Sequence, residues 1–175
     1  MNDYYEANPM SIEKIRDFAT AIRRILGISV DAPIDFEYHL DLLSLKFDET
    51  NFNYTVVPDD YGHFSENIEA YTNTKTGEIF IKESVYKELK IPNSRSNFTV
   101  AHEVGHYFLH HLLGAVLPRS TKPEKAYLSP EWQADQFAAE FLMPLEGIKN
   151  LTIDEIMFKY NVSRQAAETR FNKTR

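Results

Sequence analysis

Cysteine is absent from the 175 residues of this chain. Its absence excludes a disulfide framework, a thiolate nucleophile and a zinc site with cysteine ligands. Any bound metal ion would therefore have to be held by imidazole and carboxylate groups, which directs attention to histidine, aspartate and glutamate.

Long apolar runs and an excess of basic charge are also missing. No segment approaches the roughly 20 consecutive apolar residues of a membrane helix, and the opening MNDYYEANPM lacks the basic and apolar regions of a signal peptide. We therefore expect a cytoplasmic protein that does not bind membranes. The formal net charge of −7 disfavours a non-specific nucleic-acid binder, which would normally carry a basic stripe.

The length and composition predict one globular domain over residues 1–175. Hydrophobic residues make up 43% of the chain and charged residues 26%, which are ordinary values for a folded soluble protein. We expect residues 1–10 to be flexible and residues 152–175 to form a helical pair, similar to a helix-turn-helix, that packs on the domain.

Hydrophobic periodicity predicts a mostly helical α+β fold with a small antiparallel sheet. Apolar side chains recur with a period close to 3.6 between a capping Ser11 and Gly27. Residues 115–128 are expected to form a loop. The remaining predicted elements are helices at 36–45, 97–114, 130–143, 153–160 and 164–173, a strand at 53–57, and a β-hairpin whose strands, 68–72 and 78–82, flank the turn NTKTG.

The sequence HEVGH at residues 102–106 carries the clearest chemical signal. At about 100° per residue, His102 and His106 lie roughly 40° apart around a helix and one turn apart along it, so both imidazoles can reach one metal ion. Glu103 is turned by about one residue step from His102. This position suits a general base that activates water better than it suits a third ligand.

The predicted helix would turn both histidines toward the protein interior, where an imidazole pair without partners would be costly. A glycine within this helix, Gly105, costs about 0.5 to 1 kcal/mol relative to alanine and so indicates close approach by another element. Short H-E-x-x-H matches also arise by chance, so a third ligand is needed to decide. The residues that share the helical stripe with the histidines are Phe98, Ala101, Gly105, Leu109 and Leu113.

The third ligand must come from another element. His110 lies about 12 Å further along the helix than His102 and cannot share its metal ion without distorting the helix. His111 lies roughly opposite His102 and is expected to face solvent. On the next predicted helix, Glu131 and Asp135 share one face. Glu131 could bind the metal while Asp135 hydrogen-bonds the far nitrogen of a ligating histidine. The alternatives are a carboxylate favoured by the helix dipole and a solvated surface charge.

HEVGH, followed by the E-x-x-A-D of EWQAD and then by FAAEFLMP, resembles the ImmA/IrrE family of metallopeptidases. The lead-in NFTVAHEVGHYFLHH, the hairpin and the closing NVSRQAAETRF are similar to that family too, so the resemblance spans roughly residues 10–173. It implies a compact, zincin-like (gluzincin-like) protease domain in which His102, His106 and Glu131 bind the metal and Glu103 is the general base. Asp135 stands where the family often has asparagine.

The resemblance also implies a substrate class, namely a helix-turn-helix transcriptional repressor in phage, mobile-element or stress-response regulation. Three nitrogen and oxygen ligands with one open position favour Zn²⁺, with Mn²⁺ or another divalent ion as the alternative. The peptide could add to a strand edge of the hairpin by β-augmentation. Tyr127 and His110 are the candidates for an oxyanion donor.

Two other functions stay open. The predicted helical pair at 152–175 carries five basic and three acidic residues, a net charge of +2 that could meet DNA phosphates. Several of its apolar residues, however, are suited to packing. The other alternative is a non-proteolytic regulatory protein that binds a repressor, which Glu103 disfavours because a purely structural metal site needs no base.

Overall fold

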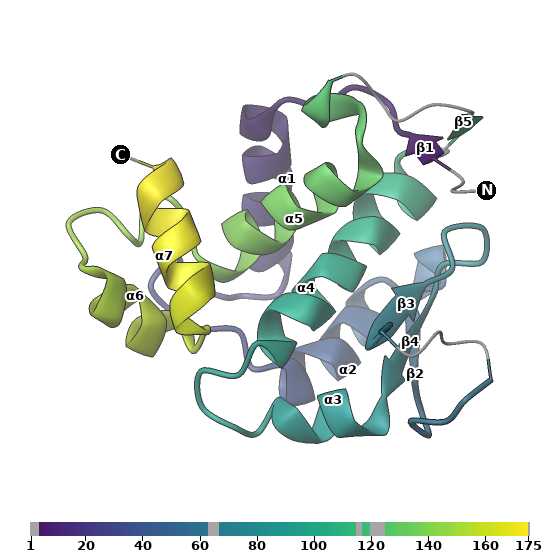
Figure 1. Cartoon of the computed structure of the whole chain (residues 1–175), viewed down its shortest axis with the longest axis horizontal. Helices are drawn as coiled ribbons and strands as arrows, with labels where there is room; N and C mark the ends of the chain where they lie inside the picture. Colours follow the sequence, from purple (N-terminus) through teal and green to yellow (C-terminus); the bar gives the residue numbers. More distant parts are fainter. Residues whose placement is uncertain (1–3, 63–66, 115–116, 120–124, 175) are drawn as a thin grey trace.

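The computed structural model describes residues 4–62, 67–114, 117–119 and 125–174. Helices surround a central helix, α4, and a small sheet lies along one side of it (Figure 1). No helix in this described part of the chain is long and apolar enough to cross a membrane. In chain order the elements are β1 (Tyr4–Glu6), α1 (Ile12–Ile25), α2 (Phe36–Lys46), η1 (Asp48–Thr50), β2 (Asn53–Val57), β3 (Ala70–Thr72), β4 (Glu78–Lys82), α3 (Glu83–Glu88), α4 (Ser96–His106), η2 (Tyr107–Leu112), β5 (Leu117–Arg119), η3 (Ala126–Leu128), α5 (Pro130–Leu142), α6 (Ile153–Tyr160) and α7 (Arg164–Lys173).

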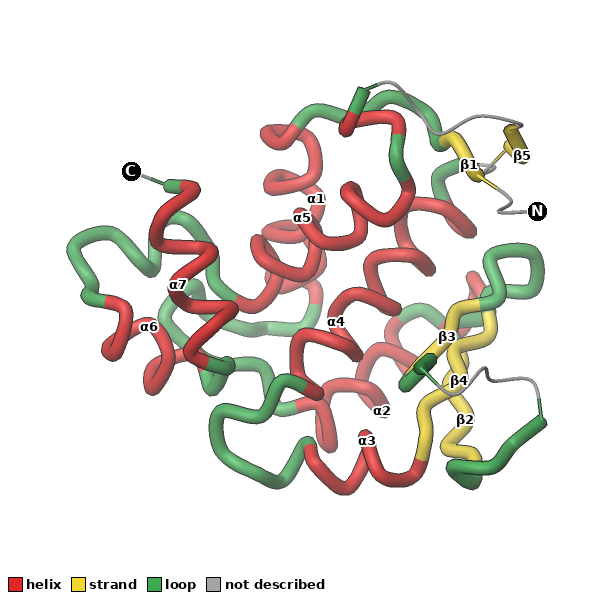
Figure 2. The backbone as a smooth tube through the Cα atoms, in the orientation of Figure 1, coloured by secondary structure: helices red, strands yellow, loops and turns green. Residues whose placement is uncertain are grey.

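The main sheet has the strand order β2-β4-β3. The predicted hairpin is confirmed, because β3 pairs antiparallel with β4 and places Ala70 opposite Ile81. The sheet is mixed, however, because β2 pairs with the other edge of β4 in parallel, with Asn53 opposite Glu78. Local sequence patterns identify strands but not this long-range pairing. Figure 2 shows the three strands on one side of α4 and the pair α6 and α7 on the other.

Helices α4 and α5 pack closely, and Gly105 makes the close approach possible. A Cβ atom added at Gly105 would lie 3.0 Å from Cδ1 of Phe137 and 3.2 Å from the carbonyl oxygen of Ala134, both on α5. These distances are tighter than ordinary van der Waals contact. The glycine within α4 therefore brings α5 against the face of α4 that carries the two histidines.

The C-terminal helical pair is fixed to the rest of the protein by a buried ionic cluster. Arg170 on α7 donates hydrogen bonds of 2.9 and 2.6 Å to the two carboxylate oxygens of Glu140 on α5. Arg16 on α1 donates to the same carboxylate over 3.1 Å. Removing one partner of a buried pair leaves an uncompensated charge, so this cluster fixes α7 relative to α1 and α5.

Three local features differ from the sequence predictions. The α-helix expected over 97–114 ends at His106 and continues as the π-helical segment η2, a change of winding that a hydrophobic stripe of a few residues does not reveal. Helix α3 was not expected. Within the expected loop at 115–128 and the expected flexible start, β5 pairs with β1, placing Tyr4 opposite Arg119.

Candidate metal centre

The structure brings together the three side chains expected to bind a metal ion. Nε2 of His102 lies 3.0 Å from Nε2 of His106 and 3.2 Å from Oε2 of Glu131. Nε2 of His106 lies 3.4 Å from Oε1 of Glu131. Tetrahedral ligands with bonds of about 2.1 Å stand roughly 3.4 Å apart, so the spacing of these donors is close to that around a zinc-sized ion.

The start of α5 places Glu131 in this group. The side chain of Ser129 caps the helix by accepting a hydrogen bond of 3.3 Å from the backbone N–H of Trp132. Pro130 occupies the first turn, where its missing N–H costs nothing. Glu131 follows directly and faces α4 because Gly105 lets the two helices approach. A helix cap and a glycine therefore determine where the third donor lies.

Asp135 supports His102 from the solvent side. One carboxylate oxygen of Asp135 lies 2.9 Å from Nδ1 of His102, the nitrogen that faces away from the donor group. The contact is the one expected from the four-residue spacing of Glu131 and Asp135. Both carboxylates are open to solvent, since the side chain of Glu131 is 73% exposed and that of Asp135 is 53% exposed.

His106 is supported from the protein interior by a chain of hydrogen bonds. Its Nδ1 lies 3.0 Å from Nδ1 of His110, and Nε2 of His110 lies 3.1 Å from Oε1 of Gln133. The amide nitrogen of Gln133 donates to the backbone carbonyls of Asn8 and Tyr127 over 2.8 and 2.7 Å. Gln133 and His110 are both buried.

These contacts fix where the protons lie. Because the Gln133 amide nitrogen donates to two carbonyls, its oxygen must accept, and Nε2 of His110 must carry the proton. Nδ1 of a neutral His110 then accepts from Nδ1–H of His106. That tautomer leaves Nε2 of His106 with a free lone pair directed at His102 and Glu131.

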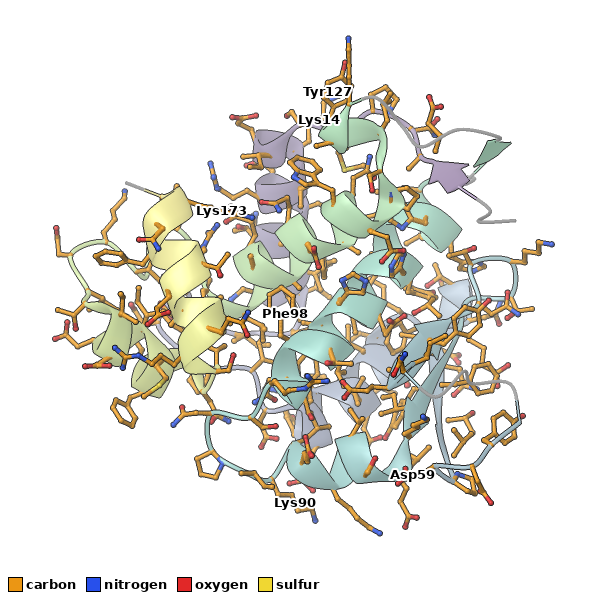
Figure 3. The ribbon with its side chains drawn as sticks, in the orientation of Figure 1. Lys14, Asp59, Lys90, Phe98, Tyr127 and Lys173 are labelled. Atoms are coloured by element: carbon orange, nitrogen blue, oxygen red, sulfur yellow. The ribbon has the colours of Figure 1, made fainter. Side chains whose placement is uncertain are left out.

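The interior position of His110 contradicts its candidacy as an oxyanion donor, because it is only 2% exposed and both ring nitrogens are engaged. Tyr127, the other candidate, lies on η3 at the upper edge of the molecule (Figure 3). Tyr127 contacts the centre through its backbone carbonyl, which accepts a hydrogen bond from the side chain of Gln133. His111, expected to face solvent, is instead half-buried, with Nδ1 3.0 Å from the carbonyl of Thr74.

Glu103 lies beside the donor group and is held by the sheet. The hydroxyl of Thr72 on β3 lies 2.6 Å from Oε2 of Glu103 and 2.9 Å from its backbone carbonyl. Both residues are buried. Sequence reasoning missed Thr72, since nothing in the run AYTN marks a threonine as the partner of a carboxylate 31 residues away.

The charges around the donor group favour a bound cation. Burial lowers the pKa of His110 to about 4, and His106 acts in the same direction, so His110 is neutral near pH 7. Burial opposes charge on His102 as well, but its hydrogen bonds with Asp135 and Glu131 outweigh this effect and raise its pKa to about 10. The hydrogen bond from His102 is the main cause that holds the pKa of Glu131 well below its usual range, and the neighbouring His106 acts in the same direction. Positive charge is thus stabilised on the outer side of the centre.

Comparison with known families agrees with this geometry. Residues 51–172 match the model of the peptidase family described as the IrrE N-terminal-like domain. The chain belongs to this family. It is therefore a protein of metallopeptidase type, a class that works with a divalent metal ion. No curated protein matches the chain.

Part of the support for the centre lies outside the IrrE N-terminal-like match. Asn8, whose carbonyl accepts from Gln133, precedes the matched region, as does α1. Helix α1 packs on α5 and contributes the buried Ile15 and Ile22 to the core. In this member of the family, the segment before residue 51 therefore supports the helix that carries Glu131.

Proposed function

We propose that the protein is a zinc-dependent endopeptidase in which His102, His106 and Glu131 hold the ion and Glu103 is the general base. The observation that carries the proposal is the cluster of donor atoms within 4.8 Å of one another, with a buried carboxylate beside it. A centre that served structure alone would have no use for that carboxylate.

The chain's own residues account for the proton movements of peptide hydrolysis. A divalent ion, when bound, would supply the Lewis acidity that acidifies water and polarises the scissile carbonyl. Glu103 takes a proton from the attacking water as the new C–O bond forms. It then gives the proton to the amine nitrogen as the C–N bond breaks. Thr72 holds the carboxylate in place through its hydroxyl, and Asp135 and His110 fix the orientations of the two imidazoles.

Strand β3 is suited to hold the substrate backbone. It is an edge strand of the main sheet, since β4 is the one strand that pairs with it among the residues the structure describes. It also lies against α4 through the contact of Thr72 with Glu103. An extended peptide that adds to this edge would run past the general base with its backbone hydrogen-bonded. Tyr71 on β3 is exposed beside that path.

The proposed substrate is a helix-turn-helix transcriptional repressor, and the support for it is the resemblance to ImmA/IrrE proteins. The test is incubation of the zinc-loaded protein with the repressor encoded nearest its gene, followed by mass spectrometry, with Glu103→Gln as the control. Defined fragments that are absent with the variant are expected. An intact repressor that still binds the protein would favour the non-proteolytic regulator instead.

Three of the five basic residues of the C-terminal pair give DNA binding little support. Lys159 pairs with Asp31 and Arg164 with Asp154, each over 2.6 Å. Arg170 is buried against Glu140. These charges are neutralised within the protein, so they are poorly placed to neutralise phosphates. Strong, salt-dependent binding to duplex DNA would contradict this view.

A further inference from the structure

A groove of about 420 Å³ lies between α4, α5 and α7. Phe98 on α4 and Ala166 on α7 supply apolar surface, and side-chain amides and hydroxyls supply most of the rest. Figure 3 shows Phe98 on the part of α4 that faces α7, with Lys173 at the upper end of α7. A surface of this mixed kind suits a polypeptide better than a small apolar ligand.

The groove continues directly from the metal centre. Arg95, Phe98 and Thr99 line it, and His102 follows on the same face of α4, since these positions are three or four residues apart. Asp135 belongs to both the groove and the metal centre, because it lines the groove and hydrogen-bonds His102. Strand β3 lies on the opposite side of α4 (Figure 1). The edge strand, the centre and the groove thus form one path across the molecule.

The outer wall of the groove is rigidly placed. Helix α7 is fixed to α5 by the buried contact of Arg170 with Glu140. Just before α7, at the end of α6, the backbone carbonyl of Asn161 accepts a hydrogen bond of 2.8 Å from the side chain of Asn97 at the beginning of α4. Both ends of the wall are therefore tied to the helices that carry the metal centre, and the groove exists before a ligand arrives.

One charge in the groove is left uncompensated. Arg95 pairs with Glu69, and Asp135 is engaged with His102. Lys173 is exposed and has no ion-pair partner within the described part of the chain. A carboxylate on the ligand would complement it.

We propose that this groove binds the substrate polypeptide on one side of the scissile bond, and that Lys173 selects an acidic side chain at a fixed position there. The inference rests on the proposed endopeptidase function and adds a substrate preference to it. Lys173 determines which substrate side chain is preferred and does not contact the reacting atoms.

The test is cleavage of a peptide library in which each position carries Glu, Gln or Lys in turn, with products identified by mass spectrometry. Wild-type protein should prefer Glu over Lys about tenfold in kcat/KM at one fixed position, because an exposed ion pair contributes up to about fivefold and a like charge acts in the opposite sense. Lys173→Gln should remove the preference and Lys173→Glu should reverse it. Lys14→Glu, a matched charge reversal at an exposed site on α1, should leave it unchanged.

The same peptides are then titrated against Glu103→Gln protein, with and without Lys173→Glu, by fluorescence anisotropy. Cleavage without a charge preference, or with one that Lys173→Glu leaves intact, overturns the groove assignment and leaves the endopeptidase standing. Binding of acidic peptides through Lys173 without any cleavage supports the groove and overturns the endopeptidase. Neither binding nor cleavage of any peptide overturns both.

Discussion

The two histidines of the metal centre are supported in opposite ways. Nδ1 of His106, the nitrogen that faces away from the donor group, contacts His110, which in turn contacts Gln133, and both of these residues are buried. This chain of hydrogen bonds ends on the backbone carbonyls of two separate segments. Nδ1 of His102 contacts Asp135, whose side chain is half exposed to solvent. The buried side uses neutral groups with fixed tautomers, and the open side uses carboxylates. Substrate must approach from the open side, so precise positioning depends most on the interior.

Truncation of the interior support should have the largest effect on metal binding. His110→Ala leaves Nδ1–H of His106 without a buried acceptor and frees the ring to change tautomer. We expect zinc affinity to fall about 100-fold, the upper end for loss of a group that orients a ligand. Competition with a chromophoric chelator measures this affinity. His39→Ala, a change at a half-buried histidine on α2, is the matched control and should alter it less than twofold.

Loss of the contact between Thr72 and Glu103 should disturb the position of the general base without weakening metal binding. Thr72→Val removes the hydroxyl and leaves a buried carboxylate with one fewer donor. We expect kcat for peptide hydrolysis to fall about 30-fold, because hydrogen bonds to charged groups contribute roughly 1.5 to 3 kcal/mol. KM and zinc affinity should change little. Thr72→Ser should restore most of kcat, and a loss shared equally by the serine variant would point to a packing defect.

Substitution on the open side of the centre should reduce zinc affinity less than substitution on the interior side. Asp135→Ala exposes Nδ1 of His102 to water, which can replace the lost acceptor because the site is solvent-accessible. We expect zinc affinity to fall about tenfold, the lower end for such a group, and Asp135→Asn to recover part of it. Chelator competition, as for His110→Ala, gives the comparison. A larger loss here than for His110→Ala would reverse the ranking of the two sides.

The open side of the centre was predictable from the sequence and the interior side was not. His102, His106, Glu131 and Asp135 follow from helical spacing and from a capped helix start, which are local properties of the chain. Gly105 even indicated the close approach of α5. Gln133, Thr72 and the carbonyl of Asn8 meet their partners only through tertiary packing, so no local pattern identifies them. The parallel pairing of β2 with β4 and the π-helical η2 escaped prediction for the same reason.

The most direct test of the proposed metal-dependent endopeptidase compares zinc-loaded wild-type protein with zinc-loaded Glu103→Gln, measuring zinc per chain and peptide hydrolysis on the same samples. We expect one ion per chain in both proteins, with hydrolysis in the variant reduced by about 10² to 10⁴-fold, the range for removal of a general base. Equal hydrolysis by the two proteins, or a wild-type protein that retains no ion, would contradict this proposal.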